Sequence, residues 1–164
     1  MSAGEEGHLE WDKSKLAEAM KLLDSEVCEY FTDGRRVSFL LERRIAREVL
    51  HGKISGNENT GYDITDSIGN KWEVRSITKR VYFPPSKNVG SGREFNKDDF
   101  LGKLREIKGY YLVDVMQFPK MPYWSLNSEE VRGWWTLGKL GKNASCSRKR
   151  IFELIVGRRQ TSLA

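Results

Sequence analysis

Two carboxylates and one cation occur around a short turn in a spacing that could hold a metal ion. Asp63 precedes the turn at residues 67–70, and Glu73 and Arg75 follow it, two residues apart on a predicted strand. Side chains two apart on a strand share one face, about 7 Å apart, and a tight hairpin can bring Asp63 beside them. Mg²⁺ uses one or two carboxylates, waters and a phosphate oxygen, and it can activate water for attack on a phosphodiester. The alternative is a surface hairpin with a salt bridge across its strands.

The chain is short of residues for other hydrolytic mechanisms. His8 and His51 are its two histidines, which are too few for a zinc site with several histidine ligands in addition to a histidine base. Cys28 and Cys146 lie far apart in the sequence, so they form neither a zinc knuckle nor a disulfide framework. If the protein is an enzyme, carboxylates and a metal ion are the expected machinery.

Composition indicates a globular protein with a weak preference for polyanions. The 164 residues carry 28 Lys and Arg against 23 Asp and Glu, a formal net charge of +5, and 38% are hydrophobic. The length predicts a single domain over residues 1–164, with an acidic, flexible segment at 1–12. The chain has no apolar run of about 20 residues and no secretory signal. We therefore expect a cytoplasmic protein with no membrane partner and no nucleotide cofactor.

Apolar periodicity predicts an α/β (α+β) fold, with a central mixed sheet and a catalytic hairpin flanked by helices. Four helices are predicted: residues 16–31, Ser38 to His51, Asn96 to about Lys108, and one that begins at Ser128. Asp33-Gly34 ends the pattern of the first. Strands are predicted at residues 62–64, 71–78, 110–118, 123–126 and 151–156. The strand at 110–118 is nearly all apolar, which is typical of a central strand covered on both faces.

The hairpin segment resembles a known nuclease signature. An Asp followed after a spacer by Glu-x-Lys is typical of the PD-(D/E)xK nuclease superfamily, and the matching stretches here are DITD at 63–66 and EVRSI at 73–77. The helix and strand at 103–117, and the strand and aromatic-rich helix at 123–135, are similar in order to small homodimeric type II restriction endonucleases of the Pvu II type. The resemblance covers most of residues 35–157 and implies a restriction-endonuclease-like fold.

The resemblance also implies a role for each residue of the hairpin. Asp63 and Glu73 would bind Mg²⁺, with the Val74 carbonyl as a third ligand. Arg75 stands where the family has a lysine, and it takes the role of the cation. An arginine stays charged and can stabilise a phosphate bidentately, but it cannot deprotonate water. If the lysine's role is electrostatic, the arginine can replace it; if the role is proton abstraction, the protein is slow or inactive.

Further residues are candidates for binding the metal and the DNA. Glu48 on the second helix and Glu58 in the following loop are candidates for an additional carboxylate, against the alternative that both face solvent. The stretch 86–93 is a candidate reader of base edges, or else an ordinary flexible loop. Its expected DNA contacts are Lys87, Asn88, Ser91 and Arg93. The candidate phosphate contacts are Lys79, Arg80, Lys103, Arg148, Lys149 and Arg150.

Together these features predict a Mg²⁺-dependent endonuclease of double-stranded DNA, most simply a type II restriction enzyme that acts as a homodimer. A palindromic site matches a two-fold dimer, and the helix at 16–31 is a candidate dimer element. One alternative is a non-catalytic DNA-binding protein on the same scaffold, in which Arg75 marks lost chemistry. Another is a repair or junction nuclease that reads DNA structure instead of sequence. Metal-dependent cleavage would separate the restriction enzyme from the non-catalytic binding protein. Discrete product bands would separate it from the repair or junction nuclease.

Overall fold

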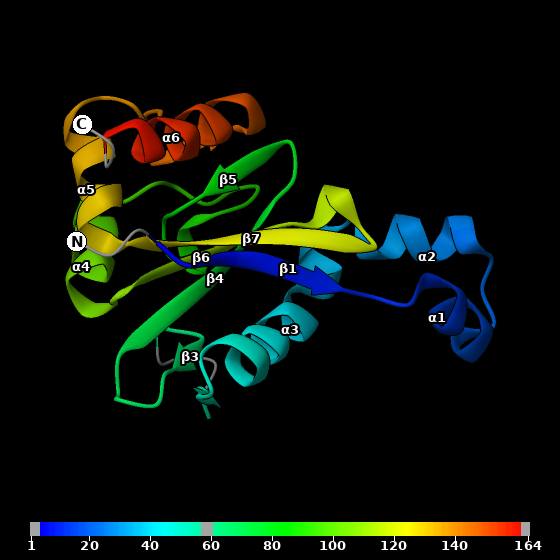
Figure 1. Cartoon of the computed structure of the whole chain (residues 1–164). Helices are drawn as coiled ribbons and strands as arrows, with labels where there is room; N and C mark the ends of the chain where they lie inside the picture. The colour runs from blue at the N-terminus through cyan, green and yellow to red at the C-terminus, as the bar shows by residue number, and fades with distance from the viewer. Residues whose placement is uncertain (1–3, 57–60, 162–164) are drawn as a thin grey trace.

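A curled, mixed β-sheet crosses the centre of the molecule (Figure 1). The computed structural model describes residues 4–56 and 61–161, and within them this sheet has six strands in the order β1-β7-β6-β4-β3-β2. β4 and β6 are parallel, whereas the other neighbours are antiparallel. The strands are β1 (Glu6–Glu10), β2 (Lys53–Ile54), β3 (Ile64–Thr65), β4 (Lys71–Ile77), β6 (Gly109–Asp114) and β7 (Lys120–Asn127). A short second sheet pairs β5 (Arg80–Tyr82) with β8 (Ser145–Ser147).

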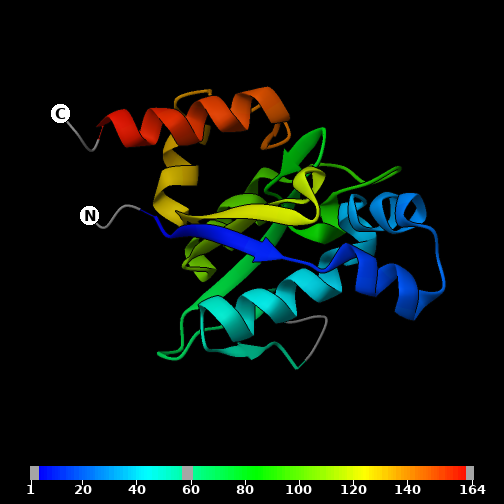
Figure 2. The same ribbon diagram turned by 45° about the vertical axis from the view of Figure 1, so that its right-hand side comes forward.

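Helices cover both faces of the main sheet, and two of them extend beyond it (Figure 2). The helices are α1 (Lys13–Met20), α2 (Asp24–Phe31), α3 (Gly34–Arg44), α4 (Lys97–Glu106), α5 (Ser128–Thr136) and α6 (Arg148–Thr161), and a π-helical turn, Ile45–Val49, continues α3. Figures 1 and 2 place α6 on one side of the sheet and α3 on the other, while α1 and α2 form an arm that projects past the end of β1. In residues 4–56 and 61–161, no helix is long and apolar enough to cross a membrane.

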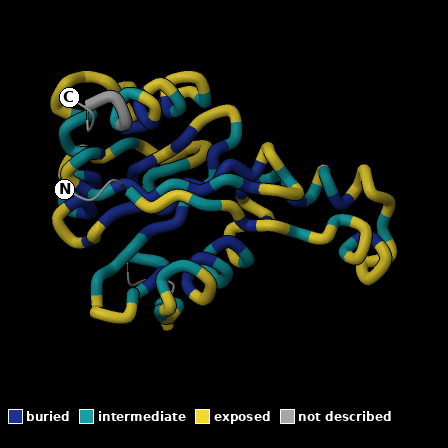
Figure 3. Tube along the Cα trace, viewed as in Figure 1, coloured by how far each residue is buried: buried dark blue, intermediate teal, exposed yellow. Residues whose placement is uncertain are grey.

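The strand β6 serves two cores, one on each face, which accounts for its nearly continuous apolar sequence. Tyr110 and Leu112 pack in the core that includes α4, α5 and α6, whereas Tyr111 and Val113 pack in the core that includes α2 and α3. Figure 3 shows the central strands as buried and much of the α1–α2 arm as exposed. Burying one large apolar side chain contributes roughly 1.5–3 kcal/mol. The buried strand β6 pairs in parallel with β4 and so stabilises it. β4 carries two residues of the candidate site, Glu73 and Arg75.

The predicted single α+β domain is confirmed, and so are the elements around the hairpin. The strand predicted at residues 71–78 is β4, and the helix predicted after Asn96 is α4. The Asn96 side chain accepts the backbone N–H of Asp99 at 2.9 Å, which is the N-cap interaction that its residue type suggests. The predicted helix from Ser128 is α5, and Asn127 caps it by accepting the N–H of Glu129 at 2.7 Å.

The prediction for residues 16–31 was wrong, because this segment forms two helices instead of one. Lys21 adopts a left-handed conformation with φ 56° and ends α1. The Glu26 side chain then accepts the backbone N–H of Leu23 at 3.0 Å, which favours a new helix start. Asp33 does not end a helix as predicted; it caps α3 by accepting the N–H of Arg35 at 3.0 Å. The second predicted helix therefore begins at residue 34 and not at Ser38.

The two ends of the chain also differ from the predictions. Residues 151–156 were predicted as a strand but lie within α6, where Ile151, Leu154 and Ile155 are buried at helical spacing. Ser147 accepts the N–H of Arg150 at 3.2 Å and so favours the helix start. The segment 1–12 was expected to be flexible, yet Glu6–Glu10 forms β1, which pairs with β7.

Candidate active site

The hairpin of β3 and β4 places Asp63 next to Glu73. The backbone N–H of Asp63 donates to the Trp72 carbonyl at 3.0 Å, and the pairing continues through β3. Asp66 stabilises the turn, because its carboxylate accepts the N–H groups of Ile68 at 3.1 Å and of residue 70 at 2.9 Å. The register of the hairpin is therefore held by a network of backbone and side-chain hydrogen bonds.

The structure brings together the two carboxylates and the cation of the predicted site. The Asp63 carboxylate accepts the backbone N–H of Val74 at 2.8 Å. Arg75 Nη1 lies 2.8 Å from Glu73 Oε2 and 4.0 Å from Asp63 Oδ2. Glu73 is 3% exposed, so its charge is compensated almost entirely by protein groups.

Backbone carbonyls fix the guanidinium of Arg75 in place. Its Nε donates to the Tyr82 carbonyl at 3.1 Å and its Nη2 to the Pro84 carbonyl at 3.2 Å. Its Nη1 donates to the Val74 carbonyl at 3.2 Å in addition to the ion pair with Glu73. The Val74 carbonyl, which the resemblance offered as a metal ligand, thus faces the arginine. These three hydrogen bonds, two of them part-buried, and the ion pair with Glu73 hold the arginine in one position.

Lys103 supplies a second cation that the sequence did not place at the site. Its Nζ contacts both Glu73 Oε1 and the carbonyl of Gly61, and the residue is 7% exposed. Lys103 was expected to contact a DNA phosphate, but the residue is buried in α4 beside Glu73. The two oxygens of Glu73 are therefore each paired with a different cation, Arg75 on one side and Lys103 on the other.

A third carboxylate comes from α3. Glu42 is close enough to Glu73 and Asp63 to interact with both electrostatically, and burial raises its pKa. The candidate Glu48 is instead paired with Arg44 one helical turn away, and this hydrogen bond holds the pKa of Glu48 below its usual value. Glu58, the other candidate, lies outside the described residues.

Close packing between α3 and β4 explains the position of Glu42. A side chain in place of Gly34, at the start of α3, would collide with Ser76, next to Arg75. The absence of a side chain at Gly34 therefore lets α3 approach the strand closely. The available sequence signal was that Glu42 is the one acidic residue in the segment 34–47. The contact depends on tertiary packing, however, and no local pattern indicates it.

The two carboxylates of the hairpin differ in how they hold protons. Burial and the neighbouring negative charge of Glu73 raise the pKa of Asp63 to about 8. Burial opposes ionisation of Glu73 as well, but Arg75 and Lys103 outweigh it and lower the pKa of Glu73. At neutral pH the pair therefore carries about one negative charge, and it shares one proton.

A cavity of about 530 Å³ opens beside this pair. Asp63, Glu73 and Lys103 line it, together with acidic residues of α4, among them Asp98 and Glu106. In the described part of the chain, no group of three or more His, Cys, Asp and Glu residues is arranged to hold a metal. Two hard carboxylates facing a space with room for several waters fit Mg²⁺, which keeps part of its water shell. The residues present therefore fit the ion through Asp63 and Glu73, without the Val74 carbonyl.

The loop predicted to read DNA bases is folded onto the protein. Lys87 Nζ lies 3.4 Å from the Asp99 carboxylate, and Asn88 Nδ2 donates to it at 3.1 Å. Arg93 Nη1 donates to the carbonyl of Ser86 at 2.8 Å. Ser91, a further candidate, is exposed. The loop is thus tied to the start of α4, and its polar groups would have to exchange partners to contact bases.

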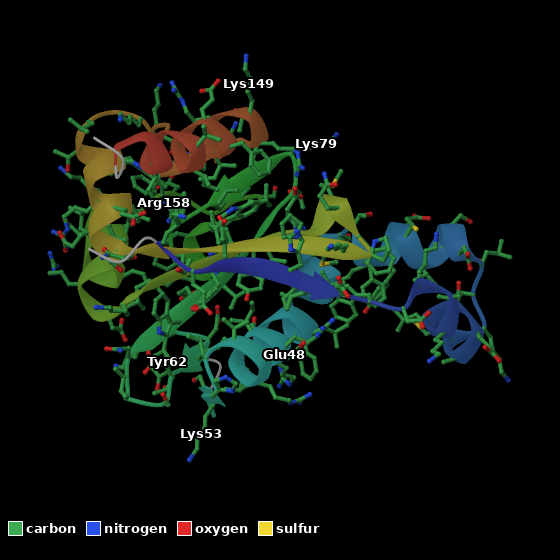
Figure 4. All side chains as sticks on the ribbon, viewed as in Figure 1. Glu48, Lys53, Tyr62, Lys79, Lys149 and Arg158 are labelled. Carbon is green, nitrogen blue, oxygen red and sulfur yellow. The ribbon has the colours of Figure 1, made fainter. Side chains whose placement is uncertain are left out.

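The structure gathers the other basic candidates at the junction of β5 and α6. The backbone N–H of Arg148 donates to the Lys79 carbonyl at 2.9 Å, and Arg80 pairs with Ser147 across the small sheet. The guanidinium of Arg148 makes a bidentate ion pair with Asp114, both contacts at 2.6 Å. The exposed members of this basic cluster are Lys79, Arg80, Lys149 and Arg150, and Figure 4 shows Lys79 and Lys149 at the same end of the molecule.

Comparisons with known proteins give no family for the chain. No protein-family model matches the sequence, and a search of curated proteins found no significant match. The function is therefore argued from the site itself.

Proposed function

We propose that this protein is a Mg²⁺-dependent endonuclease that cleaves double-stranded DNA at a short palindromic site, as a type II restriction enzyme does. The observation that carries the proposal is the pair of carboxylates, Glu73 buried and Asp63 half-buried, which line an open cavity beside two cations, Arg75 and Lys103. A surface salt bridge would explain one carboxylate and one cation. It would not explain a second buried cation and an acidic cavity at the same place.

Asp63 and Glu73 would hold the ion, and each of the neighbouring residues has a distinct task. A bound Mg²⁺ would supply Lewis acidity and compensate the charge that develops on the phosphate. Arg75 keeps Glu73 ionised and fixes its direction, since it contacts Glu73 Oε2 at 2.8 Å. In the reaction, water attacks phosphorus in line and the 3′ oxygen leaves, which gives 5′-phosphate and 3′-hydroxyl ends. Glu42 adds a third carboxylate near the pair, and its ionised form would favour a cation at this end of the sheet.

A homodimer would present one such site to each DNA strand. The sequence pointed to residues 16–31 as the dimer element, and this segment is the projecting α1–α2 arm (Figures 1 and 2). Met20 and Leu23 are 41% and 68% exposed near the tip of the arm. Apolar side chains exposed on a projecting arm suit burial against a second copy.

One observation favours a second candidate, a DNA-binding protein without catalysis. Arg75 Nη1 contacts Glu73 Oε2 at 2.8 Å and the Val74 carbonyl at 3.2 Å, and it lies 4.0 Å from Asp63. A fixed guanidinium close to these oxygens compensates their charge without a metal. In this candidate the surface around the carboxylates would bind DNA. The guanidinium of Arg75 would take the place of the metal ion.

Incubation of the purified protein with phage DNA and Mg²⁺ tests the proposal. We expect discrete fragments that depend on Mg²⁺ and disappear with EDTA or in Asp63→Ala. Glu129→Gln is a matched control, because Glu129 is an exposed carboxylate on α5. A smear or products only from junctions would support a structure-specific nuclease. Retained DNA binding with no cleavage in any divalent metal would support the second candidate.

A further inference from the structure

We propose that Lys103, and not Arg75, is the cation that meets the scissile phosphate, while Arg75 is a fixed counter-ion behind the carboxylates. This inference rests on the proposed function, because it assigns a residue to the same site. From the sequence, Arg75 was predicted to be the catalytic cation, because it occupies the lysine position of the Glu-x-Lys pattern. The structure places one cation at each oxygen of Glu73, Arg75 from β4 and Lys103 from α4.

The position of Arg75 excludes it from the substrate side. Its three guanidinium nitrogens donate to the carbonyls of Val74, Tyr82 and Pro84. Among the described residues, Arg75 is not part of the cavity lining, whereas Asp63 and Glu73 are. To reach a phosphate in the cavity, the arginine would have to give up these bonds and cross the carboxylates. Losing three hydrogen bonds and the ion pair with Glu73 together makes that movement unfavourable.

The position of Lys103 meets the requirements for a substrate-facing cation. Its ammonium contacts Glu73 Oε1, the oxygen opposite the one held by Arg75. The residue lines the cavity together with Asp63 and Glu73. Its other partner is a single carbonyl, that of Gly61, in an exposed segment before Asp63. A lysine stem is flexible and carries a compact charge, so a phosphate oxygen can replace the carbonyl at little cost.

Removal of the Lys103 charge should affect catalysis and metal binding in opposite directions. Lys103→Met keeps an unbranched side chain one atom shorter and removes the charge, and Arg75 still compensates Glu73. A charge-stabilising group at the phosphate accelerates cleavage by roughly 10²–10³-fold, so the variant should lose that factor. A cation beside Glu73 also repels a divalent ion, so Mn²⁺ should bind the variant roughly 3–10-fold more tightly than the wild type. A purely structural lysine would weaken both properties together.

The experiment combines three measurements on the intact chain: single-turnover cleavage with Mg²⁺, Mn²⁺ affinity without DNA by electron paramagnetic resonance, and thermal unfolding. Lys97→Met is the matched control, since Lys97 lies exposed on the same helix. Lys103→Arg should recover part of the cleavage. Arg75→Lys should lower the melting temperature, because one ammonium cannot donate to three carbonyls, and should keep at least a tenth of the wild-type rate.

Three results would overturn the inference. One is Lys103→Met with wild-type cleavage and unchanged Mn²⁺ affinity. Another is Lys103→Met with cleavage and Mn²⁺ affinity weakened together, as a structural lysine would give. The third is Arg75→Lys with cleavage lost at an unchanged melting temperature. If Lys103→Met does not fold, Lys103→Gln is measured in the same way. If the wild-type protein cleaves no DNA, the proposed function fails on its own, and tighter Mn²⁺ binding by Lys103→Met still supports the placement of Lys103 beside the ion.

Discussion

Asp63→Asn removes a carboxyl group that holds a proton at neutral pH, and the stability of the metal-free protein should then depend less on pH. Burial and the charge of Glu73 raise the pKa of Asp63 to about 8, far above its ordinary value of 3.8. The folded state therefore binds a proton that the unfolded state has already released between about pH 4 and 8. The stability that this proton contributes is complete below pH 4 and is lost as pH rises through 8.

The size of the effect follows from proton linkage. Each pH unit in this window reduces the free energy of unfolding by up to about 1.4 kcal/mol for one proton. The side chain of Asp63 is 23% exposed and Arg75 lies nearby, so the realised change from pH 5 to 8 should be roughly 1–3 kcal/mol. Asparagine is neutral and keeps an oxygen that can accept the Val74 N–H. Asp63→Asn therefore removes the titrating proton and keeps the hydrogen bond.

Urea unfolding in EDTA at pH 5, 6, 7 and 8 measures this difference. The informative quantity is the wild-type slope of stability against pH minus the slope of Asp63→Asn, because other titrating groups cancel. Asp66→Asn is the control, since the pKa of Asp66 is lowered by its hydrogen bonds from Trp72 and Asn70. Equal slopes in the wild type and Asp63→Asn would show that Asp63 is ionised in the folded protein, and the shared-proton account of the pair would be wrong.

Three further outcomes follow from the site. Glu73→Ala should abolish cleavage while DNA binding persists in a filter assay, because a metal ligand serves chemistry and not recognition; a cleaving variant would contradict the assignment. Glu42→Gln should weaken Mn²⁺ binding roughly 10-fold, the lower end of outer-sphere effects, as measured by titration without DNA. Replacing the three loop residues by alanine should cost about 1–3 kcal/mol of specific binding for each base contact, measured against competitor DNA. These residues are Lys87, Asn88 and Arg93.

The hairpin could be predicted from the sequence because all of its signals are local. Asp63, the turn and Glu73 lie within eleven residues, and the alternation of β4 fixes which side chains share a face. α4 was predicted for a similar reason, since the cap at Asn96 and the stop near Gly109 are adjacent to the helix. Such features need no knowledge of which elements pack together.

The errors in the prediction of the fold come from short signals that allow two structures. Residues 151–156 are apolar and partly β-branched with one charged residue, and a run of six such residues is compatible with either a strand or a helix. Burial of Ile151, Leu154 and Ile155 in the core with α4 and α5 decides for the helix. The break at Lys21 was hidden because the apolar spacing continues across it, although a left-handed residue ends α1.

The remaining members of the site could not be found in the sequence, because they reach Glu73 through tertiary packing. Glu42 arrives from α3, and Lys103 arrives from α4 on the other side of the strand. A short motif describes the residues of one strand. The charge of Glu73, which is 3% exposed, must also be compensated by groups from the neighbouring helices, and the motif does not include them. When the motif carries an arginine that is fixed to carbonyls, a mobile cation has to come from another element. The contacts of Lys103 show that α4 can supply one. The substitution of arginine for lysine is therefore compatible with catalysis, provided that the charge at the substrate side comes from α4.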